Sequence, residues 1–485
     1  MQRSVQLVLG PPGTGKTTRL VSMVEDQIAR GADPSDLAFV SFSRRAVREV
    51  VDRLDAASHD DDFPFFRTIH STAFRLCGLK RQDVLQAAHL TQFSELIGMR
   101  MRSTTDDPNL LWEGTLADQA LGLWFISRAR ETTLRSEWKH AMLADLPWEL
   151  VDYVVSNYER FKRTNGLFDF HDMIAKAEGR LPVHTIYIDE AQDTSTAQWS
   201  LLRRIISPDT HVVIAGDDDQ CIYSWSGASS EFLLRVQADV TVLPHSYRLP
   251  STIKDAADRI VQRIRQRRPK VFEPRGTGGV IEWHSELEDL DLGGEQSWLL
   301  LARSNYQLGT LRALARQQGV VYTLPSGEWS WSLPSVRAAQ AYERCRKGHS
   351  ITRTELRLLN QYLARPKELT RDVFAWEDLW SEDAKNHSWM EALPYMPPGD
   401  REYIRALRRR GESLTRPGRV RIGTVHSVKG AEADNVVLVT DISKKVDHGR
   451  AVDPDSEHRV LYVGLTRAKE RVILMRPRTS VFWSI

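Results

Sequence analysis

The stretch Val5-Gln-Leu-Val-Leu9 followed by Gly10-Pro-Pro-Gly-Thr-Gly-Lys-Thr17 decides the fold of this chain. The first part is an apolar run of strand length, and the spacing of Leu20, Val21 and Val24 after the loop predicts a helix. The loop matches GxxxxGK[ST], whose glycines let backbone N–H groups surround phosphate oxygens at a helix N-terminus. The sequence therefore predicts a phosphate-binding loop between a strand and a helix.

The residues of this loop are candidate nucleotide ligands. Lys16 would reach the outer phosphates of a nucleotide, and the Thr17 hydroxyl would ligate Mg²⁺. The full candidate set is Gly10, Pro11, Pro12, Gly13, Thr14, Gly15, Lys16, Thr17 and Thr18.

A second apolar run, Thr185-Ile-Tyr-Ile188, predicts a strand that ends in Asp189 and Glu190. In phosphoryl transfer, one of two adjacent carboxylates can bind the metal ion while the other acts on the attacking water. Asp189 would hold Mg²⁺ through water, and Glu190 would orient and deprotonate the water that attacks the γ-phosphate. An Asp-Glu pair after a strand is commonly just a solvated helix start, so the phosphate loop is what favours the catalytic interpretation.

The segment Gly216-Asp-Asp-Asp-Gln-Cys-Ile-Tyr-Ser-Trp-Ser-Gly-Ala228 follows a third apolar run, Val212–Ala215. Polar groups just after a parallel strand lie at the edge of the sheet that binds ligands. Gln220 has both a donor and an acceptor with which to sense a terminal phosphate, and Trp225 has a flat face for a base. The alternative is an acidic surface turn followed by a core tryptophan.

The composition is that of an ordinary globular protein of two to four domains, with 485 residues, 41% hydrophobic and 27% charged. The formal net charge of +2 combines acidic and basic stretches, so a nucleic-acid partner is allowed but not required. Cys77, Cys221 and Cys345 form no CxxC pair, which argues against a zinc site and a disulfide framework. No apolar stretch approaches the ~18 residues of a membrane span, so we expect a cytoplasmic protein with no membrane partner.

Eight blocks of the chain, in order, resemble the motifs of superfamily 1 DNA helicases of the UvrD/Rep (SF1A) type. Each block alone is weakly specific, but the ordered set covers most of both motor lobes of that family. The blocks are Ser41–Ala46, Thr68–Ser71, Phe168–Phe170, Asp189–Asp193, Gly216–Ala228, Tyr247–Arg248, Gly423–Glu432 and Tyr462–Ala468.

The resemblance implies an α/β fold of two RecA-like P-loop NTPase lobes, each a parallel sheet flanked by helices with a mainly helical insertion. The expected bounds are 1–85 and 166–245 for lobe 1A, 86–165 for helical insertion 1B, 246–325 and 416–485 for lobe 2A, and 326–415 for a reduced 2B-like insertion. The apolar spacing of Leu116, Ala120, Leu123 and Trp124 independently predicts a helix in the first insertion.

The resemblance also implies that ATP and Mg²⁺ bind between the lobes. Lobe one would supply Lys16, Thr17, Asp189, Glu190 and Gln220. Lobe two would supply two arginine fingers, Arg248 and Arg467, because a planar, permanently charged guanidinium stabilises charge on the γ-phosphate. Tyr247 would stack on adenine, Glu432 would hydrogen-bond the ribose, and Gly430 belongs to the same predicted nucleotide site.

A path for single-stranded DNA follows from the same resemblance. Phe42 and Trp225 match positions that stack on bases, although isolated aromatic residues are more often part of a core. The positions that match contacts to the sugar-phosphate backbone are Thr68, His70, Thr424, His426 and Ser427. Backbone contacts carry little sequence information, so binding independent of base sequence is expected.

Two further stretches allow more than one interpretation. The run Arg259–Lys270 has apolar residues at helical spacing and predicts an amphipathic helix ending before Pro269, with a basic face that is either solvated or in contact with DNA. The second stretch is rich in tryptophan, for which core packing is favoured over a duplex or partner contact. Its tryptophans are Trp329, Trp331, Trp376, Trp380 and Trp389.

These patterns predict an ATP-dependent translocase on single-stranded DNA and a helicase, with 3′ to 5′ polarity implied by the resemblance. One alternative is a DNA-stimulated ATPase that remodels protein–DNA complexes with little unwinding. A nucleotide-switch binding module is a second alternative, disfavoured by Glu190 and the two arginines. Expected partners are single-stranded DNA, junctions of single- and double-stranded DNA, and an accessory or loading protein. The expected setting is DNA repair or replication at the nucleoid of a bacterial or phage-infected cell.

Overall fold

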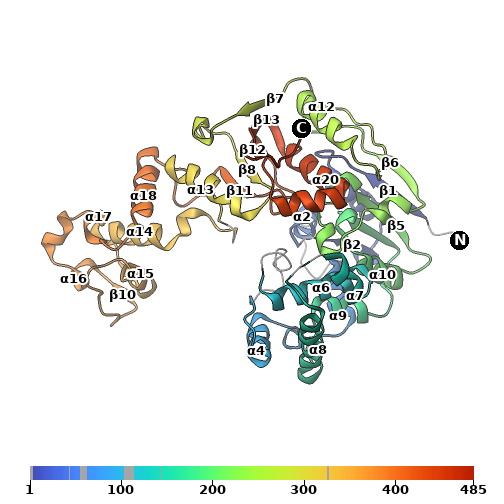
Figure 1. Cartoon of the computed structure of the whole chain (residues 1–485), viewed down its shortest axis with the longest axis horizontal. Coiled ribbons are helices and arrows are strands. Elements are labelled where there is room, and N and C mark those ends of the chain that lie inside the picture. The colour runs from blue at the N-terminus through green and yellow to red at the C-terminus, as the bar shows by residue number, and fades with distance from the viewer. Residues whose placement is uncertain are drawn as a thin grey trace. The chain divides into compact units, whose positions relative to one another are not determined.

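The computed structural model describes residues 4–42, 44–54, 63–102, 114–141, 143, 145–324 and 327–485. The chain forms two compact units, labelled by element in Figure 1. Unit 1 consists of Met1–Leu249, Ile260–Gly276 and Asp453–Tyr462, and unit 2 of Pro250–Arg259, Thr277–Val452 and Val463–Ile485. Within the described ranges, every helix is too short or too polar to span a bilayer.

Unit 1 is built on a six-stranded sheet in the order β3-β2-β4-β5-β1-β6, in which all neighbours are parallel. Its strands are β1 Val5–Leu9, β2 Leu37–Ser41, β3 Phe66–Thr68, β4 Thr185–Asp189, β5 His211–Gly216 and β6 Asp239–Val242. Its helices are α1 Lys16–Ala29, α2 Arg44–Leu54, α3 Ile69–Leu76, α4 Ala87–Ile97, α6 Leu116–Arg130, α7 Leu134–Ala141, α8 Trp148–Asn165, α9 Phe170–Lys176, α10 Thr196–Ile205 and α11 Glu231–Arg235. The three strands expected from apolar runs are confirmed.

Both faces of this sheet are covered, which explains why its strands are continuously apolar. Side chains alternate along each strand, so Leu7 and Leu9 join one buried cluster while Val8 joins another. The first cluster includes residues of α3, α9 and α10, and the second includes residues of α1. Leu20, Val21 and Val24 of α1 are buried, as their spacing predicted.

The carboxyl ends of four neighbouring strands bring the predicted site residues to one edge of the sheet. Leu9 is in register with Gly216, and Ser41 is in register with Asp189. The phosphate loop, Phe42, Glu190 and the acidic turn therefore leave the sheet side by side. This edge is where open parallel sheets bind ligands.

A helical group of α4, α6, α7 and α8 inserts between β3 and β4 and has its own buried cluster. The helix predicted from Leu116, Ala120 and Leu123 is confirmed as α6. It begins at a capping box in which Thr115 accepts from the backbone N–H of Asp118, and Asp118 accepts in return from that of Thr115.

Unit 2 contains a five-stranded parallel sheet in the order β11-β8-β12-β13-β7. The strands are β7 Val280–His284, β8 Trp298–Ala302, β11 Val420–Thr424, β12 Ala433–Val439 and β13 Ala468–Met475. Its helices are α13 Leu308–Gln317, α14 Pro334–Arg346, α15 Arg353–Leu359, α16 Trp376–Leu379, α17 Trp389–Ala392, α18 Pro398–Arg410 and α19 Lys444–Val452, and β9 Ile351–Thr352 pairs with β10 Val373–Phe374. The two parallel sheets with flanking helices confirm the expected α/β class.

The tryptophan-rich stretch belongs to the core of unit 2. Trp376 and Trp389 are each 1% exposed, and Trp329, Trp331 and Trp380 pack against the same cluster, which also contains Trp298 of β8. Core packing, the favoured interpretation, is confirmed. Helices α14 to α18 therefore contribute side chains to the same buried cluster as the sheet of unit 2.

The compact units differ at three places from the expected domain bounds, which stay a prediction. Unit 1 extends through Leu249 rather than ending at 245, because the backbone N–H of Tyr247 donates to Gly13 O and the Ser246 hydroxyl donates to Pro12 O. Ile260–Gly276 and Asp453–Tyr462 also belong to unit 1.

The expected helix over the basic run is wrong beyond Val261. Helix α12 spans Ser251–Val261, and no helix continues towards Pro269. Backbone N–H groups that would bond four residues back are taken by carboxylates from distant parts of the chain. Asp455 accepts from the N–H groups of residues 265 and 266, and Asp218 accepts from that of residue 268.

Candidate functional site

The phosphate loop has the backbone shape that its glycines predict. Gly13 and Gly15 have φ of 74° and 76°, the left-handed region that other residues rarely adopt. Gly15 precedes α1 and has no side chain to cap it, so the first N–H groups of the helix remain available to an anion. Lys16 Nζ donates to Gly10 O at 2.9 Å, so its ammonium lies beside the loop. The N–H groups and this ammonium are donors of the kind that phosphate oxygens accept from.

The two candidate Mg²⁺ ligands lie together. Thr17 Oγ1 donates to Asp189 Oδ2 at 2.7 Å, and both oxygens are of the kind that Mg²⁺ prefers. Burial raises the pKa of Asp189 to about 7, and the neighbouring Glu190 contributes, although the Thr17 hydrogen bond opposes the shift. Burial makes the charged form of this carboxylate unfavourable, and a bound cation would make it favourable again, so Asp189 fits a cation site.

Glu190, the candidate base, is held in a strained conformation beside this pair. Its φ of 51° is unusual for a residue with a side chain. Gln192 Nε2 donates to Glu190 Oε2, while Gln192 Oε1 accepts from the Asp217 backbone N–H at 2.9 Å. Gln192 therefore joins the candidate base to the acidic turn, a link that the sequence did not suggest.

Gln220 is buried and bonded to the first residue of its own turn. Its Nε2 donates to Asp217 Oδ2 at 2.7 Å. Asp217 also accepts from the Asp219 backbone N–H, which closes the turn at Asp218–Gln220. Asp217 therefore shapes the turn, and the alternative of an acidic surface turn is wrong, because Asp217, Asp218 and Asp219 are buried.

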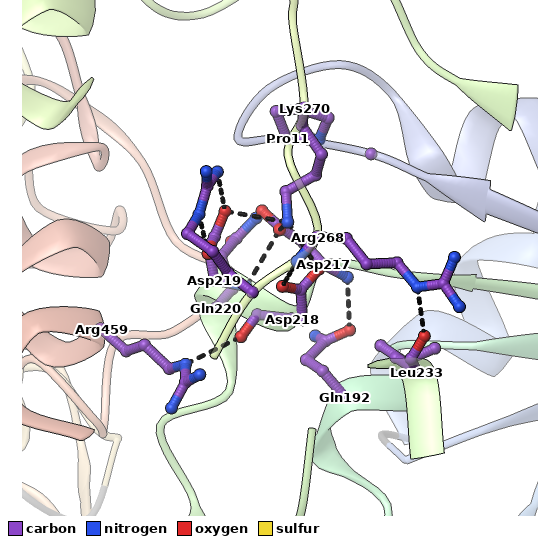
Figure 2. Close-up of polar contacts among 12 residues, drawn as sticks. Pro11, Gln192, Asp217, Asp218, Asp219, Gln220, Leu233, Arg268, Lys270 and Arg459 are labelled. Carbon is purple, nitrogen blue, oxygen red and sulfur yellow. Dashed lines mark hydrogen bonds and ion pairs between the residues drawn. The ribbon is translucent and has the colours of Figure 1, made fainter. Parts of the chain in front are cut away.

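Cations from the basic run neutralise this buried turn. Figure 2 shows the ammonium of Lys270 directed at the three aspartates, and Arg267 adds two hydrogen bonds to Asp219 at 2.9 and 2.8 Å. Burial alone would lower the pKa of Lys270, but the three carboxylates raise it above its ordinary value. These basic residues are neither simply solvated nor free to contact DNA, so both interpretations of the run are wrong for them.

Two residues of the next predicted motif lie against the phosphate loop. Tyr247 is 71% exposed, which leaves its ring open to a base, and its backbone N–H donates to Gly13 O at 2.8 Å. A Cβ on Gly13 would lie 2.4 Å from Arg248 Cβ, so Arg248 also adjoins the loop. The structure places Arg248 in unit 1, although lobe two was expected to supply it.

Three aromatic side chains form a row beside the acidic turn. Phe42 is 40% exposed and stacks on Tyr223, with ring centroids 5.9 Å apart and an interplanar angle of 22°. Tyr223 meets Trp225 edge to face at 6.0 Å. Trp225 is half-buried. The sequence singled out the two ends of this row but not Tyr223.

The remaining candidates of unit 1 sit at the start of α3. Thr68 caps this helix, accepting from the Ser71 N–H at 3.2 Å. The His70 ring meets Phe170 edge to face at 5.3 Å. Thr68 ends β3 and His70 follows it, at the same edge of the sheet as Phe42.

Unit 2 holds the other predicted residues. Thr424 ends β11, and its hydroxyl accepts from the Ser427 N–H at 3.2 Å, with His426 between them and buried Val425 alongside. Glu432 pairs with Lys469 at 2.7 Å.

Gly430 and Arg467 complete the set in unit 2. Gly430 has φ of 82° and open space around it. Arg467 is buried, and its Nε donates to Val463 O at 2.9 Å. This hydrogen bond and the surrounding protein hold the guanidinium in one position.

Two regions of this chain match known protein families. Residues 1–241 match the UvrD/REP helicase N-terminal domain, and residues 419–475 match the UvrD-like helicase C-terminal domain. The chain belongs to the UvrD/Rep helicase family. The first match ends within β6, and the second covers β11, β12 and β13, so both sheets contain family-matched strands.

Relatives of this UvrD/Rep chain include the ATP-dependent DNA helicase PcrA of Staphylococcus aureus, 24% identical over 382 residues, which cover 70% of this chain and 51% of PcrA. YjcD of Bacillus subtilis is 25% identical over 297 residues, covering 55% of this chain and 38% of YjcD. The chain spans about half the length of the PcrA relatives that it matches. The solved structure of PRRSV helicase matches 99% of this chain and 54% of its own, with 11% identity and a TM-score of 0.36.

No group of three or more His, Cys, Asp or Glu side chains is placed to hold a metal ion in the part of the chain that the structure describes. The three acidic residues of the turn are instead neutralised by Lys270 and Arg267. One sequence signal could have suggested this pairing: three consecutive aspartates after a buried strand require cations, and the chain offers a dense basic run.

Proposed function

We propose that this chain is an ATP-dependent DNA helicase that translocates along single-stranded DNA with 3′ to 5′ polarity. One observation carries the proposal. The segment Gly216–Ala228 joins Gln220, beside the nucleotide-site residues, to the aromatic row of Phe42, Tyr223 and Trp225 within one unit. A change in the conformation of the turn can therefore shift the aromatic row, because only a few residues separate Gln220 from Tyr223 and Trp225.

Each residue of the nucleotide site has a role that its geometry supports. Lys16 and the N-terminus of α1 would bind the outer phosphates, and Thr17 and Asp189 would hold Mg²⁺, which offsets phosphate charge when bound. Glu190 would accept a proton from the attacking water. Gln192 donates to Glu190 and accepts from the Asp217 N–H, so it would link the base candidate to the acidic turn.

Coupling to DNA would pass through the turn. Stacking on an aromatic side chain contributes about 1–3 kcal/mol per base, and the partly exposed row offers such a surface. The roles of Thr424, His426 and Ser427 as contacts to the DNA backbone, and of Arg248 and Arg467 as arginine fingers, rest on their family positions. The 3′ to 5′ polarity rests on the same resemblance.

The test is unwinding of duplexes with either a 3′ or a 5′ single-stranded tail in the presence of ATP and Mg²⁺. We expect strand separation of the 3′-tailed duplex only, and none with the Lys16→Ala variant. Unwinding from the 5′ tail alone would overturn the polarity. ATP-driven movement on single strands without strand separation would instead select a DNA-stimulated ATPase that remodels protein–DNA complexes.

A further inference from the structure

The acidic turn Asp217–Asp219 places three buried carboxylates close together, and the ammonium of Lys270 forms an ion pair with each of them. Lys270 Nζ lies 3.0, 2.5 and 2.8 Å from carboxylate oxygens of Asp217, Asp218 and Asp219, and the Lys270 side chain is 2% exposed. Arg267 is a second cation, paired with Asp219 alone. Losing one partner of a buried charge leaves the other uncompensated, so Lys270 is the member on which the turn depends most.

The backbone around Lys270 is tied to the turn independently of its charge. The Arg268 N–H donates to Asp218 Oδ2 at 2.9 Å, and the Arg268 side chain donates to carbonyls at the C-terminal end of α11, including Leu233 O at 2.7 Å. Arg459 Nε donates to Asp218 O at 3.0 Å, as Figure 2 shows. These bonds bring Lys270 to the carboxylates and would keep the segment in place without the ammonium.

The turn also borders the nucleotide site. Asp217 donates its N–H to Gln192 Oε1 and accepts from Gln220 Nε2. Burial by itself would raise the pKa of Asp217, but the charges of Lys270 and of the phosphate-loop residue Lys16 lower it below its ordinary value. Lys16 and Lys270 therefore act on the same carboxylate. Uncompensated negative charge here would repel the phosphates of a nucleotide.

We propose that Lys270 is a positioning residue for nucleotide binding: it neutralises the acidic turn beside the phosphate loop and, through Asp217, fixes the amide of Gln220. Lys270 itself touches no nucleotide in this role. The inference rests on the proposed function in one respect, that the nucleotide bound is ATP.

The test compares kcat and KM for ATP, with Mg²⁺ and saturating oligo(dT), in the whole chain and its variants. Lys270→Met should raise KM by roughly tenfold, and Lys270→Arg should recover most of this loss. Adding Asp218→Asn to Lys270→Met should lower KM again, because one repelling carboxylate is gone while an acceptor for the Arg268 N–H remains. Lys254→Met, which removes an ion pair to Asp258 on α12, is the matched control and should leave KM unchanged.

An unchanged KM in folded Lys270→Met overturns the inference, as does a double variant that binds ATP no better than the single one. If Lys270→Met does not fold, Arg267→Met takes its place, because it removes only the outer ion pair to Asp219. That variant should raise KM by about two- to threefold, and an unchanged KM there is equally decisive. Absence of ATP hydrolysis by the wild-type chain would contradict the proposed function instead.

Discussion

The hydroxyl of Thr17 donates a 2.7 Å hydrogen bond to Asp189, although 172 residues separate the two in the chain. The phosphate loop and the carboxylate that ends β4 are therefore assembled at one edge of the sheet of unit 1. Because both side chains present oxygen atoms, we propose that they hold the Mg²⁺ ion.

Thr17→Ala should weaken the use of Mg²⁺. Loss of the hydroxyl removes one candidate oxygen ligand and one hydrogen bond to Asp189, which keeps the bond from the Glu190 backbone N–H. We expect ATP turnover to fall by about tenfold or more and to need a higher Mg²⁺ concentration for half-maximal rate. The measurement is turnover against MgCl₂ concentration, with Thr91→Ala on the surface of α4 as a control. An unaltered Mg²⁺ dependence would remove Thr17 from the site.

Glu190→Gln should separate chemistry from binding. The amide keeps the shape of the side chain but cannot accept a proton from water, so turnover should fall by about 10²–10⁴-fold. ATP should still bind, which filter retention of radiolabelled ATP can measure. Retained hydrolysis in this variant would mean that Glu190 is not the base.

The two left-handed glycines of the phosphate loop should differ in their tolerance of a side chain. A Cβ on Gly13 would lie 2.4 Å from Arg248 Cβ, whereas one on Gly15 would meet nothing closer than 3.7 Å. Both alanine variants carry backbone strain of about 1–2 kcal/mol, but only Gly13→Ala adds a steric clash. ATP affinity should therefore fall further in Gly13→Ala than in Gly15→Ala. Equal losses would indicate that strain alone matters.

Trp225→Ala should uncouple DNA from ATP hydrolysis. The side chain lies in the aromatic row, whereas the residues around Lys16 are untouched, so basal turnover should persist while stimulation by single-stranded DNA is lost. Tyr223→Ala should have the same effect, because Tyr223 contacts both Phe42 and Trp225. Trp283→Ala, a partly exposed tryptophan of β7, is the control. Normal stimulation in Trp225→Ala would refute this assignment.

A second buried charge cluster predicts a pH-dependent stability. Lys162 lies 2.6 Å from Asp169 and 2.7 Å from Asp172, and its side chain is 2% exposed. Burial disfavours the charged forms of both Lys162 and Asp169, but the attraction between their opposite charges outweighs it. The pKa of Asp169 is therefore lowered from 3.8, and that of Lys162 is raised from 10.5. The ion pair therefore stabilises the folded state between pH 3.8 and pH 10.5. This stabilisation is lost in acid as Asp169 protonates below pH 3.8, and in base as Lys162 loses its proton above pH 10.5.

Lys162→Met should accordingly lower the free energy of unfolding by about 3–5 kcal/mol at pH 7, because it removes the ammonium that neutralises buried Asp169 and Asp172. Asp172 keeps its ion pair with Arg128 in this variant. The difference from wild type should shrink at pH 3. Urea unfolding followed by circular dichroism measures both values. Lys254→Met is the control, because it removes a more exposed ion pair, to Asp258, that contributes about 1 kcal/mol or less. A difference that does not depend on pH would show that packing, not charge, is responsible.

The sequence predicted the strands and the loop because their signals are local. The apolar run before Gly10 and the one before Asp189 were sufficient to place both at the edge of a parallel sheet. The basic run was misjudged because Ile260, Val261 and Ile264 do have helical spacing. What ends the helix is a set of carboxylates from distant segments, including Asp218, which no local pattern reveals.

The measurement that tests the central claim most directly is the rate of ATP hydrolysis by the wild-type chain with and without saturating oligo(dT). Gln220 and Trp225 share one segment, so DNA bound at the aromatic row should alter the nucleotide site. The account predicts a turnover that rises by about tenfold or more when single-stranded DNA is added. Equal rates with and without DNA would contradict it.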